Sequence, residues 1–173
     1  MVGNLFIGID PGQSGGISWV ERTIQDGRQV NFIYAEKMPA TEHDVDILFK
    51  NLRAKGMAIK CIIENVHSMP GQGVASSFKF GRNYGFLRGL LVANRIAFDQ
   101  VSPQKWQKQL GLQKKSKEET KTFHKNNIKA KAQQLYPQLK VTLATADAIM
   151  LATYCSTQNM AVEPNPIDSN ALS

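Results

Sequence analysis

The sequence predicts an α/β domain in which helices cover both faces of a mixed five-stranded sheet. Short apolar runs bounded by turn residues open the chain, and runs of the same kind recur between helical segments. The C-terminal half of the chain is helical in pattern. Three strands in a meander, followed by strands that helices connect, indicate a mixed sheet with helices on both sides. The expected order of elements is therefore β-β-β-α-β-α-β-α-α.

Five strands are expected from the apolar runs. A turn at 11–14 separates the first two, and Asp26-Gly27 is a hairpin signal before the third. The strands are expected at residues 5–10, 15–20, 30–36, 58–64 and 97–101.

The remaining segments have helical spacing. The apolar pattern after Thr41 predicts a helix that Thr41 caps and Gly56 ends. After Pro103 the chain turns helical and basic, with a break at 111–117. The helices are expected at residues 41–55, 74–96, 118–136 and 145–158, together with the basic stretch that follows Pro103.

The length of 173 residues suits one domain with an ordinary core. Residues 1–160 are expected to form this single domain, and residues 161–173 a loosely ordered tail. No apolar stretch approaches the roughly 20 residues that span a bilayer, so no membrane is expected. Because the chain opens with a strand-like run rather than a signal peptide, we expect an intracellular protein.

Cys61 and Cys155 both lie in apolar runs. No Cys/His spacing in the sequence supports a zinc site. We therefore expect two reduced core thiols rather than a disulfide or a metal site.

The net charge of +7 is concentrated in one segment. Between Lys105 and Lys131 there are nine lysines and two glutamates, whereas the rest of the chain holds twelve basic and twelve acidic residues. Such a concentration favours a polyanion, here nucleic acid, as the partner. The alternative is a solvated helical face, which is what most charge runs form.

Three carboxylates lie where apolar secondary structure ends or begins. Asp10 closes the first strand, Glu64 closes the fourth, and Asp147 lies at the start of the last apolar helix. A buried carboxylate costs several kcal/mol unless it is paired or bound to a cation, so we expect the three to meet around metal. Carboxylates without histidine or cysteine suit Mg²⁺, or Mn²⁺ in its place, and a two-ion site performs phosphoryl displacement.

Each of these carboxylates also has a structural explanation. Asp10 followed by Pro11-Gly12 is a good turn, Glu64 could face solvent at a strand end, and Asp147 could cap its helix. The segment 8–16 also fits a phosphate-cradling loop of sugar kinases and actin-like ATPases. Those proteins need two such domains and a second Asp-Gly loop, so no nucleotide cofactor is expected.

With these residues in place, the chain resembles the RuvC-type Holliday junction resolvases of the ribonuclease H-like superfamily. Within them it is most similar to the small phage, poxvirus and mitochondrial branch. The resemblance extends from Ile7 to about Cys155. It rests on Gly8-Ile9-Asp10-Pro11-Gly12, Ile63-Glu64, the Gly81/Gly85/Gly89 helix, Val101-Ser102-Pro103-Gln104-Lys105-Trp106, Leu110-Gly111 and Ala146-Asp147-Ala148.

The resemblance implies a homodimeric endonuclease that binds a four-way DNA junction and makes paired nicks with two Mg²⁺ ions per site. Asp10, Glu64 and Asp147 match catalytic, metal-binding acids of the family. The family usually has a fourth acid, or a histidine, three residues before the last one, and here that position is Ala144. The resemblance also implies a metal-activated water as nucleophile. It places the protein in the cytoplasm of a bacterium or a phage-infected host.

Further residues are expected to contact DNA. The apolar side chains Met69, Phe78 and Phe80 could wedge into an opened junction, with core packing as the alternative for the two phenylalanines. Small residues at Gly81, Gly85, Gly89 and Ala93 permit close approach to the protein's own sheet or, by the resemblance, to a second subunit. Lys117 and one of Lys105 or Lys108 match family lysines beside the scissile phosphate. The lysines expected to bind DNA are Lys105, Lys108, Lys114, Lys115, Lys117, Lys121 and Lys125.

Three functions are consistent with the sequence. The first is a metal-dependent crossover junction endodeoxyribonuclease. The second is a junction-binding protein with weak or no catalysis, because Ala144 replaces a usual ligand. The third is a related nuclease that acts on other branched DNA or on RNA-containing substrates.

Overall fold

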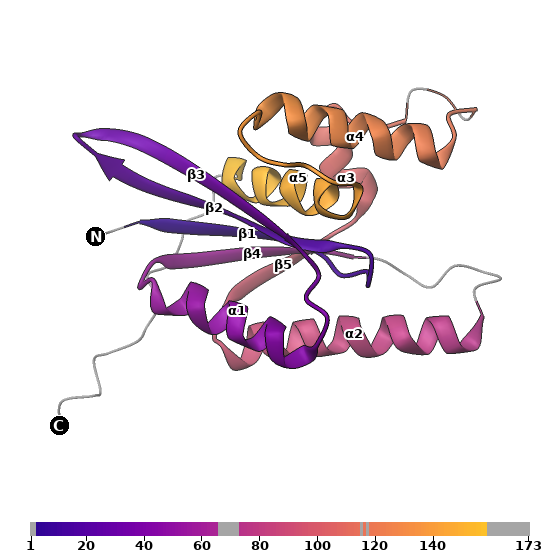
Figure 1. Cartoon of the computed structure of the whole chain (residues 1–173), viewed down its shortest axis with the longest axis horizontal. Helices are drawn as coiled ribbons and strands as arrows, with labels where there is room; N and C mark the ends of the chain where they lie inside the picture. The colour runs from indigo at the N-terminus through magenta and orange to yellow at the C-terminus, as the bar shows by residue number, and fades with distance from the viewer. Residues whose placement is uncertain (1–2, 66–72, 115, 117, 159–173) are drawn as a thin grey trace.

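The computed structural model describes residues 3–65, 73–114, 116 and 118–158. They form one five-stranded sheet in the order β3-β2-β1-β4-β5, with helices on both faces (Figure 1). The strands are β1 (Asn4–Asp10), β2 (Gly16–Gln25), β3 (Arg28–Lys37), β4 (Ala58–Glu64) and β5 (Ala97–Val101). The helices are α1 (Glu42–Ala54), α2 (Val74–Ala93), α3 (Pro103–Gln109), α4 (Lys121–Leu135) and α5 (Leu143–Thr157).

The predicted fold class is confirmed, with one helix more than the predicted order. The basic region after Pro103 contains both α3 and α4, which the positive-φ residue Gly111 helps to separate. Helix α2 ends at Ala93, three residues before the expected end, and Ile96 is buried beyond it. Strands β2 and β3 are longer than expected because their outer ends pair as an exposed hairpin.

The hairpin turn between β2 and β3 follows the sequence signal. Asp26 and Gly27 have φ values of 50° and 73°, and Gln25 pairs with Arg28 across the turn. Two consecutive positive φ values match the right-handed twist of the strands, and Asp-Gly adopts them readily. The hairpin therefore places β3 at the edge of the sheet, next to β2, and β1 lies between β2 and β4.

The central strand β1 pairs antiparallel with β2 and parallel with β4. In the parallel pair, Ile9 lies opposite Ile63, so the two strands end together at Asp10 and Glu64. The structure thus confirms that the first and fourth strands are neighbours in the sheet. Since side chains alternate along a strand, the face opposite to Ile9 and Ile63 receives both carboxylates.

The two faces of the sheet carry separate cores. Helices α1 and α2 cover one face, where they pack on Ile7, Ile9 and Ile63. Helices α3, α4 and α5 cover the other face, where Phe6 and Ile62 are buried. Helix α5 lies directly on β1 and β2, and α4 packs on the outside of α5. Asp10 and Glu64 therefore project toward the α5 side of the sheet.

Close packing of α5 on β1 depends on Gly8. A Cβ atom at this position would lie 2.2 Å from the backbone nitrogen of Ala152 and 2.5 Å from the carbonyl oxygen of Ala148. No side chain fits there, so the helix backbone rests against the strand backbone. This contact sets the height of α5 above the sheet, and with it the position of Asp147.

Side-chain caps begin α1, α3, α4 and α5. The predicted Thr41 cap is confirmed, since its hydroxyl accepts from the backbone N–H of Asp44 at 3.1 Å. Helix α5 begins two residues earlier than expected, with a capping box between Thr142 and Thr145. Ser102 and Thr120 cap α3 and α4 in the same way.

Both cysteines are buried and free, as expected for core thiols. Burial raises the pKa of Cys61 and raises that of Cys155 to about 12. Among the described residues, no helix combines the length and the apolar character that a membrane span requires. The expected tail at 161–173, together with Met69, Lys115 and Lys117, lies outside the described residues.

Candidate active site

Asp10 is held by the turn that follows β1. The backbone N–H of Gly12 donates to Asp10 Oδ1 at 3.3 Å, and Gly15 donates to the carbonyl oxygen of Gly12 at 2.9 Å. A Cβ atom at Gly15 would lie 2.7 Å from Asp10 Cγ, so only glycine leaves room for this carboxylate. The turn explanation of Asp10 is therefore confirmed, and the same turn orients its carboxylate; its role in a metal site stays a prediction.

Glu64 is buried, with 7% of its surface exposed, so it does not face solvent at the strand end. Its Oε1 accepts a hydrogen bond from the indole Nε1 of Trp106 at 2.8 Å. Trp106 is fully buried on α3. The motif around Trp106 gives no sign of this role in the sequence, because a contact across 42 positions leaves no local signal.

Asp147 lies inside α5 rather than at its N-cap. Thr142 is the cap, so the alternative of a capping role for Asp147 is wrong. Asp147 is half-buried between Ala146 and Ala148, both of which are buried. The first turns of α5 thus present Asp147 toward the end of the sheet where β1 and β4 stop.

The three carboxylates interact electrostatically. Burial, followed by the charge of Asp147, raises the pKa of Asp10 from 3.8 to about 6. Burial raises the pKa of Glu64 from 4.5 to about 8, with further increases from the charges of Asp10 and Asp147, while the Trp106 hydrogen bond lowers it. Burial likewise raises the pKa of Asp147. Strands β1 and β4 and helix α5 therefore bring the three predicted acids into one electrostatic cluster.

The donor atoms of this cluster are of the type that a hard cation such as Mg²⁺ prefers. These donors are carboxylate oxygens, and the raised pKa values of Asp10 and Glu64 show that nearby positive charge offsets burial and mutual repulsion only in part. Within the described ranges, no group of three or more His, Cys, Asp or Glu side chains is arranged so that it could hold a metal ion. The assignment of Asp10, Glu64 and Asp147 as metal ligands therefore stays a prediction.

Among the described lysines, Lys125 is the one that interacts electrostatically with all three acids. Its charge lowers the pKa of Asp10, Glu64 and Asp147. Lys125 is exposed on the first turns of α4. The sequence predicts Lys125 only as one of several DNA-binding lysines, because spacing along a helix does not show which lysine faces the end of a sheet.

His124, the neighbour of Lys125, is buried and bonded at both ring nitrogens. Nδ1 lies 3.1 Å from Glu119 Oε1, and Nε2 lies 3.1 Å from Gln107 Oε1. Its charge in the protonated form lowers the pKa of Asp147. His124 therefore connects α3, α4 and the loop before α4, and it holds Lys125 beside the site.

Four of the five described lysines that are predicted to bind DNA belong to α3 or α4, which cover the same face of the sheet as α5 (Figure 1). The fifth, Lys114, lies in the connection between these two helices. All are exposed, as a DNA-binding surface requires: Lys105, Lys108, Lys114, Lys121 and Lys125. Exposure also fits a solvated helical face, so their role in DNA binding stays a prediction.

Phe78 and Phe80 lie on different sides of α2. Phe78 is 71% exposed, so the core-packing alternative is wrong for it. Phe80 is half-buried and stacks on Tyr84, with ring centroids 6.0 Å apart. Among the described residues only Phe78 of the two has the exposure that a wedge in DNA needs.

The small-residue stripe of α2 is open to solvent. Gly81, Gly85 and Gly89 are exposed, and a Cβ atom added at any of them would have no described atom within 4 Å. The alternative in which the stripe packs on the protein's own sheet is therefore wrong. Val74 and Val92 on the same helix are 87% and 67% exposed.

Ala144 occupies the first turn of α5, one turn before Asp147. Residues three apart on a helix share a face, so the Ala144 methyl group lies on the Asp147 side. A Cβ atom at Gly16 would approach the Ala144 carbonyl oxygen to 3.0 Å. The position is therefore next to the end of β1, and it offers no donor from its side chain.

Comparisons with known proteins agree with this architecture. No family model and no curated protein matches the sequence. RuvC from T. thermophilus in complex with a Holliday junction substrate is structurally similar, with a TM-score of 0.55 and 11% identity over 87% of this chain and 91% of that chain.

A second Thermus thermophilus RuvC structure has a TM-score of 0.54 and 12% identity over 87% of this chain and 92% of that chain. The yeast mitochondrial Holliday junction resolvase has a TM-score of 0.44 and 14% identity over 86% of this chain and 75% of that chain. The chain therefore has the ribonuclease H-like fold of the RuvC Holliday junction resolvases.

Proposed function

We propose that the protein is a metal-dependent, structure-selective DNA endonuclease that resolves four-way junctions by paired nicks. The observation that supports this most strongly is the electrostatic cluster of Asp10, Glu64 and Asp147 at the end of β1 and β4. The exposed lysines of α3 and α4 on the same side, and the RuvC-like fold, support DNA as the substrate.

Each residue has a defined role in this proposal. Asp10, Glu64 and Asp147 would hold two Mg²⁺ ions, which when bound would activate water and stabilise the charge on the phosphate. Trp106 fixes the orientation of Glu64 through its indole N–H. Lys125, which is exposed and acts electrostatically on all three acids, would bind a non-bridging oxygen of the scissile phosphate.

The test is nicking of a labelled synthetic junction in Mg²⁺ or Mn²⁺. Asp10→Asn should reduce nicking on the order of 100-fold or more. Asp46→Asn is the matched control, because Asp46 is paired with Lys50 on the surface of α1. Junction binding without cleavage in either metal would contradict the proposal. Flaps, replication forks and RNA hybrids in the same assay test whether the substrate is another branched or RNA-containing molecule.

A junction-binding protein with weak or no catalysis is the second candidate, and Ala144 favours it. The position lies beside the cluster without a donor side chain. If the missing ligand limits the reaction, Ala144→Asp should increase nicking while the affinity for the junction falls or stays the same. An active parent chain that Ala144→Asp does not improve would remove this candidate.

The same proposal includes a homodimer, since paired nicks need two sites. The exposed face of α2 is suited to the contact because Gly81, Gly85 and Gly89 let a second backbone approach, and Val74 and Val92 flank them with apolar surface. Gly85→Glu should shift the protein to monomers in sedimentation. A dimer unchanged by this substitution would place the contact elsewhere.

A further inference from the structure

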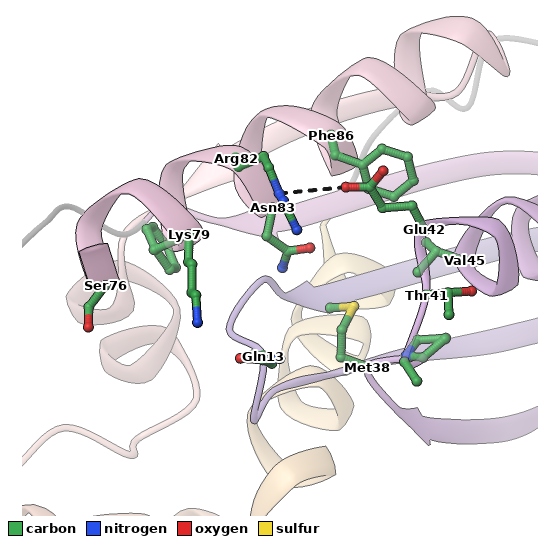
Figure 2. A pocket seen from close by; sticks show the side chains of 13 residues that line it. Gln13, Met38, Thr41, Glu42, Val45, Ser76, Lys79, Arg82, Asn83 and Phe86 are labelled. Atoms are coloured by element: carbon green, nitrogen blue, oxygen red, sulfur yellow. Dashed lines mark ion pairs between the residues drawn. The ribbon is translucent and has the colours of Figure 1, made fainter. Parts of the chain in front are cut away.

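A cavity of about 540 Å³ lies away from the acidic cluster, beneath the N-terminal half of α2. Figure 2 shows Lys79 and Asn83 pointing from α2 toward the β1–β2 turn, where Gln13 lies, with Met38 and Thr41 across the cavity. Pockets of about 300–1,000 Å³ hold small ligands, so a single nucleotide fits in this volume.

The cavity and the candidate active site share the turn after β1. Asn83 lines the cavity, and its Nδ2 donates to the carbonyl oxygen of Pro11 at 2.6 Å. Pro11 directly follows Asp10, and Gln13 lies in the same turn. The turn therefore connects the two places: Asp10 at its start belongs to the cluster, and Gln13 lines the cavity.

The lining of the cavity has two parts that together match one nucleotide. Phe80 and Phe86 offer aromatic rings and Met38 an apolar surface against which a base can stack. Lys79 and Arg82 supply positive charge beside them. Stacking rings next to basic side chains are the usual elements of single-strand recognition.

The charge of the cavity suits a single phosphodiester. Of the three charged side chains in the lining, two are basic and the third, Glu42, lies 3.8 Å from Arg82 in an ion pair. The excess is therefore one positive charge, which one phosphodiester balances. A free nucleoside triphosphate would leave several negative charges without a partner, since the described residues that line the cavity include no pair of carboxylates for Mg²⁺.

We propose that this cavity binds one unpaired nucleotide of the branched DNA substrate, with its base against Phe80 and Phe86 and its phosphate on Lys79. The proposal rests on the proposed function, because it takes branched DNA as the substrate. It adds a preference: at a crossover, an unpaired base enters the cavity while the neighbouring strand lies at the Asp10 turn. Selectivity for strained or open junctions follows from this preference.

The test uses the full chain with Asp10→Asn, so that DNA is bound and not cut. Two four-way junctions with identical arms are compared, one fully paired and one with a single unpaired nucleotide at the crossover. The unpaired junction should bind about five- to 100-fold more tightly, the effect expected for one stacked base. Phe80→Ala and Lys79→Ala should each remove most of this preference.

Lys50→Ala is the matched control, since Lys50 is an exposed lysine of α1 that lies outside the cavity. It should leave the ratio of the two affinities unchanged. Lys79 is exposed, so its substitution keeps the test valid if Phe80→Ala unfolds the chain. Equal affinity for the two junctions, or a preference that survives both cavity substitutions, would overturn the cavity proposal and leave the endonuclease proposal standing.

A short single-stranded oligothymidylate separates the remaining outcomes. If the chain binds neither junction, the proposed function fails; oligothymidylate binding that Lys79→Ala abolishes would still support the cavity as a nucleotide site. If oligothymidylate does not bind either, both proposals fail. Displacement of the oligonucleotide by equimolar deoxyadenosine triphosphate would overturn the cavity proposal in favour of a free nucleotide.

Discussion

At the scale of single residues, the hydrogen bond from Trp106 to Glu64 ties helix α3 to the acidic cluster. It is buried, it measures 2.8 Å, and it lowers the pKa of Glu64 more than the charge of Lys125 does, against the effect of burial. A donor behind a metal-binding carboxylate typically contributes about 10- to 100-fold in metal affinity or activity.

Trp106→Phe should therefore raise the Mg²⁺ concentration for half-maximal nicking by about 10- to 100-fold, because the ring is kept and the N–H donor is lost. Trp19→Phe provides the comparison. Trp19 is also buried, and its indole donates to Glu21 at 3.2 Å, outside the site. Equal Mg²⁺ dependence in the two variants would show that Trp106 has only a packing role.

Lys125→Ala should lower the rate of nicking at saturating DNA roughly tenfold or more, because the positive charge that faces all three acids is lost. Lys129, one turn later on α4, affects none of their pKa values, so Lys129→Ala should weaken DNA binding and leave the saturated rate unchanged. Single-turnover kinetics measure the difference. A loss confined to DNA affinity in both variants would make Lys125 an ordinary phosphate contact.

At the scale of elements, the contact between α5 and β1 positions Asp147 over the strand that carries Asp10. The two backbones meet at Gly8, where any side chain would overlap Ala148 and Ala152. Sequence patterns give the helix and the strand separately. They do not give the distance between the two elements, which depends on this one missing side chain.

Gly8→Ala should lower the free energy of unfolding by about 2 kcal/mol or more, because backbone atoms rather than a flexible side chain would have to move. Gly81→Ala is the matched control. It has open space on α2, and replacing a helical glycine should raise stability by up to about 1 kcal/mol. Denaturant unfolding measures both, and a Gly8→Ala chain as stable as its parent would contradict the packing.

At the scale of the whole molecule, burial of the acids predicts how stability depends on pH. The folded-state pKa values of Asp10 and Glu64 are raised to about 6 and about 8, above their ordinary 3.8 and 4.5. At a pH between the ordinary pKa and the raised pKa of each acid, the folded chain binds more protons than the unfolded chain. The free energy of unfolding therefore falls as pH rises through this range.

The melting temperature of the metal-free protein should therefore fall between about pH 5 and about pH 8, and Glu64→Gln should reduce that fall. Mg²⁺ favours the ionised acids, so it should stabilise the parent chain more at about pH 8 than at about pH 5. Circular dichroism melts in EDTA and in Mg²⁺ give both comparisons. A melting temperature that rises with pH in EDTA would contradict the burial of these acids.

Local rules in the sequence were sufficient for much of the fold. The turn at Asp26-Gly27, the Thr41 cap and the five apolar runs depend on a few consecutive residues, and the structure confirms them. Element ends were less accurate, as at α2 and α5, because burial and caps decide where a periodic pattern stops. The full lengths of β2 and β3 could not be predicted, because their exposed ends pair without an apolar pattern in the sequence.

The sequence by itself determined the types of the elements and the three acids at their ends, since an acid that closes an apolar run is visible in consecutive residues. Tertiary structure alone decided which side chains meet. It turned Asp10 and Glu64 toward α5, brought Trp106 to Glu64, and left the Gly81 face of α2 open. The physical reason is that contacts between distant segments depend on strand pairing and helix packing, which no local pattern encodes.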